Sequence, residues 1–110
     1  MKTGNILKLP AEIPKKELFE KLAQEKDVLI ERIVSYGHKT PDDYWYNQEK
    51  DEWVILFQGE AVILFEDETE INLKSGDYLL IPKHKKHRVK KTSSPCIWLA
   101  VHGNLQANNN

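Results

Sequence analysis

Cysteine and histidine, two side-chain types often used as nucleophiles, acid–base groups and metal ligands, are few in this chain of 110 residues. There are one cysteine, Cys96, and four histidines, His38, His84, His87 and His102. Cys96 follows Ser94-Pro95 at the start of an apolar run with no histidine beside it, so we expect a buried small apolar side chain and no nucleophile. An imidazole can act as an acid, a base or a metal ligand near neutral pH. The histidines are therefore the first candidates for a functional site.

Composition narrows the class of protein. Sixteen basic and seventeen acidic side chains give a net charge of −1, so no overall field attracts nucleic acid or an anionic membrane. The longest apolar run, residues 53–57, is too short to span a membrane, and the polar first residues do not resemble a signal peptide. A lone cysteine fits a reducing compartment. We predict one cytoplasmic domain that folds without disulfides.

The elements that must position a site are mostly strands. Residues 14–26 place Leu18, Phe19, Leu22 and Ala23 at helical spacing, which predicts a short N-terminal helix. After it, short apolar runs alternate with turn residues at a spacing of about 8 to 12 residues, which favours an all-β sandwich or barrel. The predicted organisation is an N-terminal segment with a helix over 1–27, a barrel over 28–104 and a polar tail over 105–110.

Residues 52–57 and 61–65 form two of these predicted strands, and the turn at 58–60 between them indicates a β-hairpin. Side chains alternate between the two faces of a strand, and in both of these strands the side chains on either face are apolar. A hairpin with one face in solvent would have polar side chains on that face. Something must cover the outer face, either the N-terminal helix or a second copy of the chain. We predict a homodimer.

Two spaced patterns resemble the motifs of the cupin superfamily, which are small jelly-roll barrels, also described as double-stranded β-helices. Glu52-x6-Gly59 matches the second half of the first cupin motif, and Gly76-x5-Pro82-x4-His87 matches the second motif. The resemblance covers residues 37–102. It implies a cupin barrel in which Glu52 and His87 take the places of metal ligands.

The chain departs from the family pattern where cupins carry a pair of histidines in the first motif. Those places hold Trp45 and Asn47, or Tyr46 and Gln48, depending on the loop register. The second motif has His84 in place of a glycine and Lys91 in place of an asparagine. Because typical cupins bind iron, manganese, nickel or zinc through three histidines and the glutamate, two ligands alone make a poor metal site.

Missing ligands could come from elsewhere in the chain. The side-chain oxygen of Gln48 could join Glu52 and His87, or His102 could complete a two-histidine, one-carboxylate set. Strand parity does not decide whether His102 points inward. The interpretation places a divalent transition metal on Gln48, Glu52 and His87. Tyr46, Trp98 and His102 are the candidate substrate-binding residues, and we expect His38 and His84 to lie in solvated loops.

Residues 83–91 contain six basic side chains in nine positions. They could form a patch for nucleic acid, or a solvated loop whose lysines discourage pairing of an edge strand. The balanced net charge favours the loop, so nucleic-acid binding is the weaker hypothesis. A third alternative is that one or two of these cations lie at the barrel mouth and select an anionic small molecule.

The resulting hypothesis is a small cupin-like homodimer whose barrel-mouth pocket binds a divalent metal and acts on a small organic ligand. With a metal, the resemblance implies oxygenase or isomerase chemistry, and without one Glu52 and His87 could still act as an acid–base pair. The alternative is a non-catalytic barrel that binds or senses a small molecule.

Overall fold

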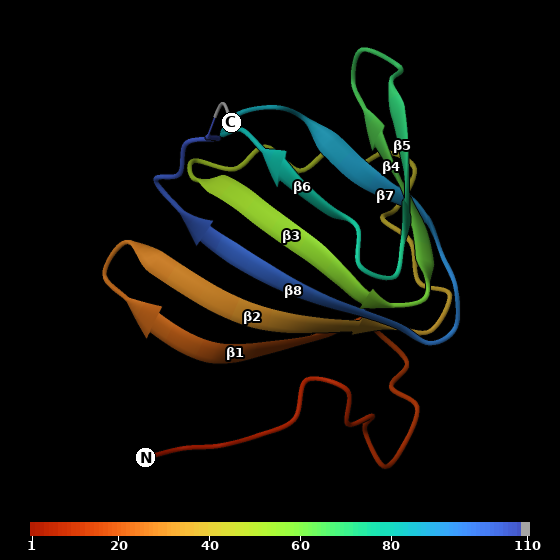
Figure 1. Ribbon diagram of the computed structural model, residues 1–110. Coiled ribbons are helices and arrows are strands. Elements are labelled where there is room, and N and C mark those ends of the chain that lie inside the picture. Colours follow the sequence, from red (N-terminus) through yellow and green to blue (C-terminus); the bar gives the residue numbers. More distant parts are fainter. Residues whose placement is uncertain (109–110) are drawn as a thin grey trace.

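A computed structural model describes residues 1–108, which fold into eight strands arranged as two facing sheets (Figure 1). Residues 109 and 110, the end of the predicted polar tail, lie outside the described residues. The strands are β1 (Leu18–Glu25), β2 (Val28–Ser35), β3 (Asp51–Gln58), β4 (Glu60–Phe65), β5 (Glu70–Lys74), β6 (Tyr78–Ile81), β7 (His87–Thr92) and β8 (Cys96–Gly103). The all-β jelly roll predicted from the sequence is confirmed.

One sheet has five strands in the order β1-β2-β8-β3-β6, and the other has three in the order β5-β4-β7. The pairings between these strands are antiparallel, and the chain repeatedly crosses from one sheet to the other. The inner faces supply the core, which includes Val54, Leu56, Ile63, Phe65 and Trp98. The barrel is therefore filled by alternate residues of strands from both sheets.

The predicted hairpin of β3 and β4 is wrong. β3 pairs with β8 and β6, whereas β4 pairs with β5 and β7 in the other sheet. Gly59 makes the crossing with φ of +100°, and a Cβ at this position would lie 2.4 Å from the Ser93 hydroxyl oxygen. The turn needs glycine both for its backbone angle and for space. It carries the chain between sheets instead of returning it along β3.

The predicted N-terminal helix is also wrong, because residues 18–25 form β1 at the edge of the larger sheet. The pairing of β1 with β2 shifts register between Lys21 and Ala23, which is a β-bulge. A bulge interrupts the two-residue alternation of a strand, so its apolar residues acquire a spacing that imitates a helix. No helix that could cross a membrane occurs among residues 1–108.

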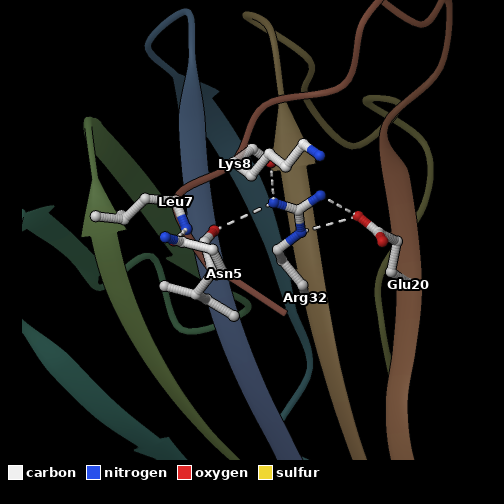
Figure 2. A network of polar contacts seen from close by, with 6 residues as sticks. Asn5, Leu7, Lys8, Glu20 and Arg32 are labelled. Carbon is white, nitrogen blue, oxygen red and sulfur yellow. Dashed lines mark hydrogen bonds and ion pairs between the residues drawn. The ribbon is translucent and has the colours of Figure 1, made fainter. Parts of the chain in front are cut away.

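Arg32 ties the N-terminal segment to the outer side of the larger sheet (Figure 2). Its guanidinium donates hydrogen bonds to the Glu20 carboxylate on β1 and to the backbone oxygens of Ile6 and Lys8. Arg32 is only 8% exposed. Because side chains alternate across a strand, Arg32 lies on the outer side of β2 while its neighbour Glu31 lines the interior.

Candidate functional site

A cavity of about 70 Å³ lies between the two sheets. All six residues predicted from the sequence to bind metal or substrate line it: Tyr46, Gln48, Glu52, His87, Trp98 and His102. They come from β3, β7, β8 and the loop that precedes β3. The structure thus brings the predicted residues together, although they span more than half of the sequence.

Glu52 occupies the centre of this set. On β3 it lies opposite His102 of β8 and, on its other side, opposite Ile81 of β6. It is only 8% exposed. Burial raises the pKa of the Glu52 carboxyl, and the nearby imidazoles of His102 and His87 only partly oppose that effect. The site holds a carboxylate whose charge the protein leaves incompletely compensated.

His87 begins β7 and faces Glu52 across the cavity. Its Nδ1 lies 2.9 Å from the Lys85 backbone oxygen, and because a carbonyl only accepts, this nitrogen carries the proton. In this tautomer of the neutral ring Nε2 has the lone pair, and it lies 3.7 Å from Oε1 of Glu52. The ring stacks on Tyr46 with centroids 5.7 Å apart. A backbone bond on Nδ1 and an aromatic neighbour fix the direction of Nε2, as in ligating histidines.

A distance of 3.7 Å is too long for a direct hydrogen bond between Glu52 and His87. Two ligand atoms on a tetrahedral ion at about 2.1 Å each would lie about 3.4 Å apart. The gap between the two side chains is therefore close to that of a pair sharing one metal ion. Glu52 and His87 fit the roles that the first and second cupin motifs imply for them.

Beyond Glu52 and His87, the side chains that could bind a metal ion are weaker ligands. Within residues 1–108, no three His, Cys, Asp or Glu side chains converge closely enough to hold a metal ion. Gln48 lines the same cavity, and its amide is close enough to Glu52 to lower the pKa of that carboxyl slightly. An amide oxygen is an acceptable hard ligand. The donors that fit a divalent ion are thus Glu52, His87 and the neutral Gln48.

His102 points into the cavity, which the sequence left undecided, but it is engaged by a residue that the sequence analysis missed. Its Nε2 lies 2.9 Å from Oε1 of Glu31 on the neighbouring strand β2. The hydrogen bond to Glu31 raises the pKa of His102, and the charge of Glu52 adds to that effect. The sequence does contain a sign of this role. Glu31 interrupts the mostly apolar segment 28–34 and lies on the same strand face as Ile33, so it is expected to point inward.

The remaining candidates divide between the cavity and the surface. Burial raises the pKa of the Tyr46 hydroxyl at the cavity wall. The indole nitrogen of Trp98 is fully buried and has no hydrogen-bond partner in the described part of the chain. His84 is exposed and bonds Asn47, while His38 bonds the backbone at Lys15, and neither lines the cavity.

Cys96 is completely buried, and burial raises the pKa of its thiol to about 12. Such a thiol is almost never ionised at neutral pH and is unreactive. This agrees with the prediction that Cys96 is a small apolar core residue.

Three of the six basic side chains in the stretch 83–91 form ion pairs with nearby carboxylates. Lys85 pairs with Asp67 at 3.5 Å, Lys86 pairs with Glu66 at 3.4 Å, and Lys90 pairs with Glu70. All three acidic partners belong to the hairpin formed by β4 and β5 (Figure 1). None of the basic side chains of 83–91 lines the cavity. The alternative in which these cations select an anionic molecule at the barrel mouth is therefore not supported.

A second, wider depression of about 440 Å³ adjoins the cavity, since Gln48 and His102 line both. We call it the vestibule. Its wall is formed by the turn between β1 and β2, residues 24–29, and by residues 48–50. Nζ of Lys50 lies 3.2 Å from both the backbone oxygen and Oδ1 of Asp27, which joins the two walls. A ligand could enter the cavity from here.

Residues 32–102 match the model of the family described as "Cupin domain". The chain belongs to the cupin family. The match includes β3 to β8 and the part of β2 that follows Glu31, and so contains every site residue predicted from the sequence. Two turns that the sequence resemblance relied on, at Gly59 and Gly76, have the positive φ values that glycine permits, +100° and +94°.

Several solved structures superpose well on this one. A candidate mannose-6-phosphate isomerase from Ralstonia eutropha JMP134 is 38% identical, with a TM-score of 0.86, and the match covers 96% of this chain and 100% of that one. A cupin superfamily protein from Desulfitobacterium hafniense DCB-2 is 25% identical, with a TM-score of 0.74 and coverage of 87% and 84%. A Thermus thermophilus protein at 21% identity, 94% and 98% coverage and a TM-score of 0.77 supports the fold alone. No curated protein sequence matched significantly.

Proposed function

We propose that this cupin binds a divalent transition metal, iron, manganese, nickel or zinc, through Gln48, Glu52 and His87 and acts on a small organic ligand in the adjoining cavity. One observation carries the proposal. Glu52 and His87 are both buried, and their facing atoms lie 3.7 Å apart with Nδ1 of His87 already bonded to the backbone. Burying a carboxylate without a compensating partner costs free energy. A metal ion bound between the two side chains would supply that partner, which supports the proposal.

When bound, the metal would act as a Lewis acid toward an oxygen atom of the ligand. The chain's own residues supply the rest. Glu52 and His87 would hold the ion, and Gln48 would add a neutral oxygen without further negative charge. His102 holds a proton at Nε2 against Glu31, and this hydrogen bond raises the pKa of the imidazole that lies beside Glu52. Apolar side chains such as Val54 and Ile63 line the cavity and limit the entry of water.

The reaction class is suggested by the relative from Ralstonia eutropha, whose name is that of a candidate isomerase. We infer that this chain catalyses a comparable rearrangement on a smaller molecule. An isomerisation of a hydroxy carbonyl compound moves one proton between neighbouring carbons and a second proton between the two oxygens, with no net oxidation or reduction. A site that combines a Lewis acid with titratable groups suits that chemistry.

The second candidate is a non-catalytic barrel that binds or senses a small ligand. It is favoured by the absence, in residues 1–108, of three His, Cys, Asp or Glu side chains around one point. Under this alternative the cavity binds its ligand by shape and hydrogen bonds, and Glu52 and His87 contact it directly.

Elemental analysis of protein purified without an affinity tag separates the two. We expect close to one equivalent of transition metal per chain, retained after dialysis, and loss of that metal in Glu52→Gln and in His87→Gln. The matched control is His84→Gln, which removes an exposed histidine three residues from His87. Protein that stays empty after incubation with all four metals would favour the non-catalytic barrel. Unchanged metal in both variants would remove these residues from the site.

We also propose that the protein is a cytoplasmic homodimer. The outer side of β3 and β6 supports the dimer, since Phe57 and Tyr78 are 38% and 67% exposed and the rings of Trp53 and Tyr78 lie 5.7 Å apart. Exposed aromatic clusters of this kind favour a partner surface. Light scattering at micromolar concentration should give twice the chain mass, and a monomeric mass would contradict the dimer.

A further inference from the structure

We infer that the cavity selects an uncharged, oxygen-bearing ligand of about three carbons and rejects the phosphate ester of the same molecule. This deepens the proposed function by naming the class of ligand, and it rests on that function for the identity of the site. The name of the Ralstonia relative would suggest a sugar phosphate. The charges and the size of this cavity argue for a different ligand.

The cavity wall is rich in carboxylates and has no lysine or arginine. Glu17, Glu31 and Glu52 all line it, together with the two histidines. Glu17 is also partly buried, and its partner is the neutral hydroxyl of Ser35. A divalent ion at Glu52 would balance these charges without leaving surplus positive charge. A phosphate group would meet no lysine or arginine among the described residues of the wall, and the charge of the proposed ion would already be balanced by these carboxylates.

Several cations that flank the cavity residues in the sequence are held by other contacts. Arg32 lies on the outer side of β2, where it holds Glu20 and the N-terminal segment (Figure 2). The guanidinium of Arg88 donates to the Asp42 backbone oxygen and lies over the Trp45 ring, 4.8 Å from its centroid. The lysines of 85–90 pair with the β4–β5 hairpin, as described above. None of these charges can turn into the cavity without breaking such a contact.

The vestibule does not supply a phosphate site either. Its wall carries three carboxylates, Glu25, Asp27 and Glu49, against two lysines, Lys26 and Lys50. Lys50 is already bonded to Asp27 at 3.2 Å. A ligand whose phosphate remained in the vestibule would therefore also face a surplus of negative charge.

Size and wall chemistry define the favoured ligand. A cavity of about 70 Å³ has room for roughly five to seven water-sized groups, which is the size of a triose. Much of the wall is apolar, including Ile33, Val54 and Ile81, and the polar atoms come from Tyr46, Gln48, Glu52 and the histidines. A short carbon chain bearing carbonyl and hydroxyl oxygens matches both parts of this wall.

The size of the discrimination follows from electrostatics. One added negative charge about 5 Å from a carboxylate, at an effective dielectric constant of about 20, weakens binding by about two orders of magnitude. The histidines offset part of this. We therefore expect dihydroxyacetone to bind at least about tenfold more tightly than dihydroxyacetone phosphate, a pair that differs only in the phosphate.

The test is a titration of the full chain with each member of this pair, followed by the NMR signal of the buried Trp98 indole N–H. Tighter binding of the neutral compound by tenfold or more supports the inference. A smaller ratio, or tighter binding of the phosphate ester, overturns it. Failure of the neutral compound to bind at about 50 mM, where even a millimolar site would fill, overturns it as well.

Two variants identify the cause. Glu17→Gln removes one wall carboxylate whose only side-chain hydrogen-bond partner is the neutral Ser35 hydroxyl, and it should narrow the affinity ratio between the two compounds by about tenfold. Glu60→Gln removes an exposed carboxylate that does not line the cavity and should leave the ratio unchanged. An unaltered affinity ratio in Glu17→Gln would contradict the electrostatic explanation. Metal content of the same samples is measured separately, so an empty but selective cavity would refute the metal proposal while leaving this inference standing.

Discussion

Replacing Glu52 by glutamine is expected to stabilise the metal-free protein while abolishing its metal binding. The carboxylate is 8% exposed, its nearest imidazole nitrogen is 3.7 Å away, and burial raises its pKa above the usual value of 4.5. Glutamine has nearly the same shape but carries no charge. The substitution therefore removes the cost of burying a poorly compensated charge and leaves the packing of β3 intact.

The size and pH dependence of this effect can be worked out. Because the folded-state pKa of Glu52 is raised above 4.5, the folded protein loses stability as the pH rises from 4.5 to that folded-state pKa, and the loss is complete above it. Below pH 4.5 the carboxyl is protonated in both states, and the variant and the parent should have the same stability. At pH 8 we expect the variant to be more stable by about 1 kcal/mol, the low end for relief of a buried charge, because His102, whose own pKa is raised, and the Gln48 amide already compensate part of that charge.

The measurement is urea unfolding of chelator-treated protein between pH 4 and pH 8.5. A gain of about 1 kcal/mol corresponds to a rise of about 4 °C in the melting temperature for a domain of this size. Glu60→Gln is the control, since this carboxylate is exposed, and it should change the free energy of unfolding by less than about 0.5 kcal/mol. A loss of stability in Glu52→Gln at pH 8 would refute the reasoning and indicate that the carboxylate makes a structural hydrogen bond.

Three further predictions concern the elements around the site. Gly59→Ala should lower the free energy of unfolding by about 3 kcal/mol, since the new methyl group would lie 2.4 Å from the Ser93 hydroxyl oxygen. Gly76→Ala also places alanine at a positive φ but in open space, and it should lower the free energy of unfolding by only about 1 kcal/mol in the same assay. Arg32→Met should lower the free energy of unfolding by about 2 kcal/mol and expose the N-terminal segment to limited proteolysis, and a protease-resistant variant would contradict its anchoring role. The pKa of His102, measured by NMR, should lie above 6.5 and should return toward 6.5 in Glu31→Gln. The stability that His102 contributes is then present below pH 6.5 and is lost as the pH rises through the folded-state pKa. An unshifted pKa of His102 in the parent protein would exclude its hydrogen bond to Glu31.

The sequence predicted the fold because the glycines at its turns and the spacing to His87 are local and specific. Its errors have a common physical origin. The bulge near Leu22 gave β1 a helix-like spacing, and the crossing at Gly59 looked like a hairpin turn. In both places the local pattern was compatible with two structures, and only the pairing of distant strands decides between them.

The candidate site was only partly visible for the same reason. Tyr46, Gln48, Glu52, His87, Trp98 and His102 could be named individually, and the structure places them around one cavity. Glu31 could not be connected to His102, because their proximity depends on the pairing of β2 with β8. The ion pairs of Lys85, Lys86 and Lys90 depend in the same way on the position of the β4–β5 hairpin.

The position of a bound ion is the most direct test of the proposed function. Crystals equilibrated with zinc should show one strong anomalous peak inside the barrel, about 2.1 Å from both Oε1 of Glu52 and Nε2 of His87. Crystals of His87→Gln should lose that peak. Zinc bound only on the outer surface, or a peak inside the barrel that touches neither side chain, would contradict the assignment of this pair as the metal-binding centre.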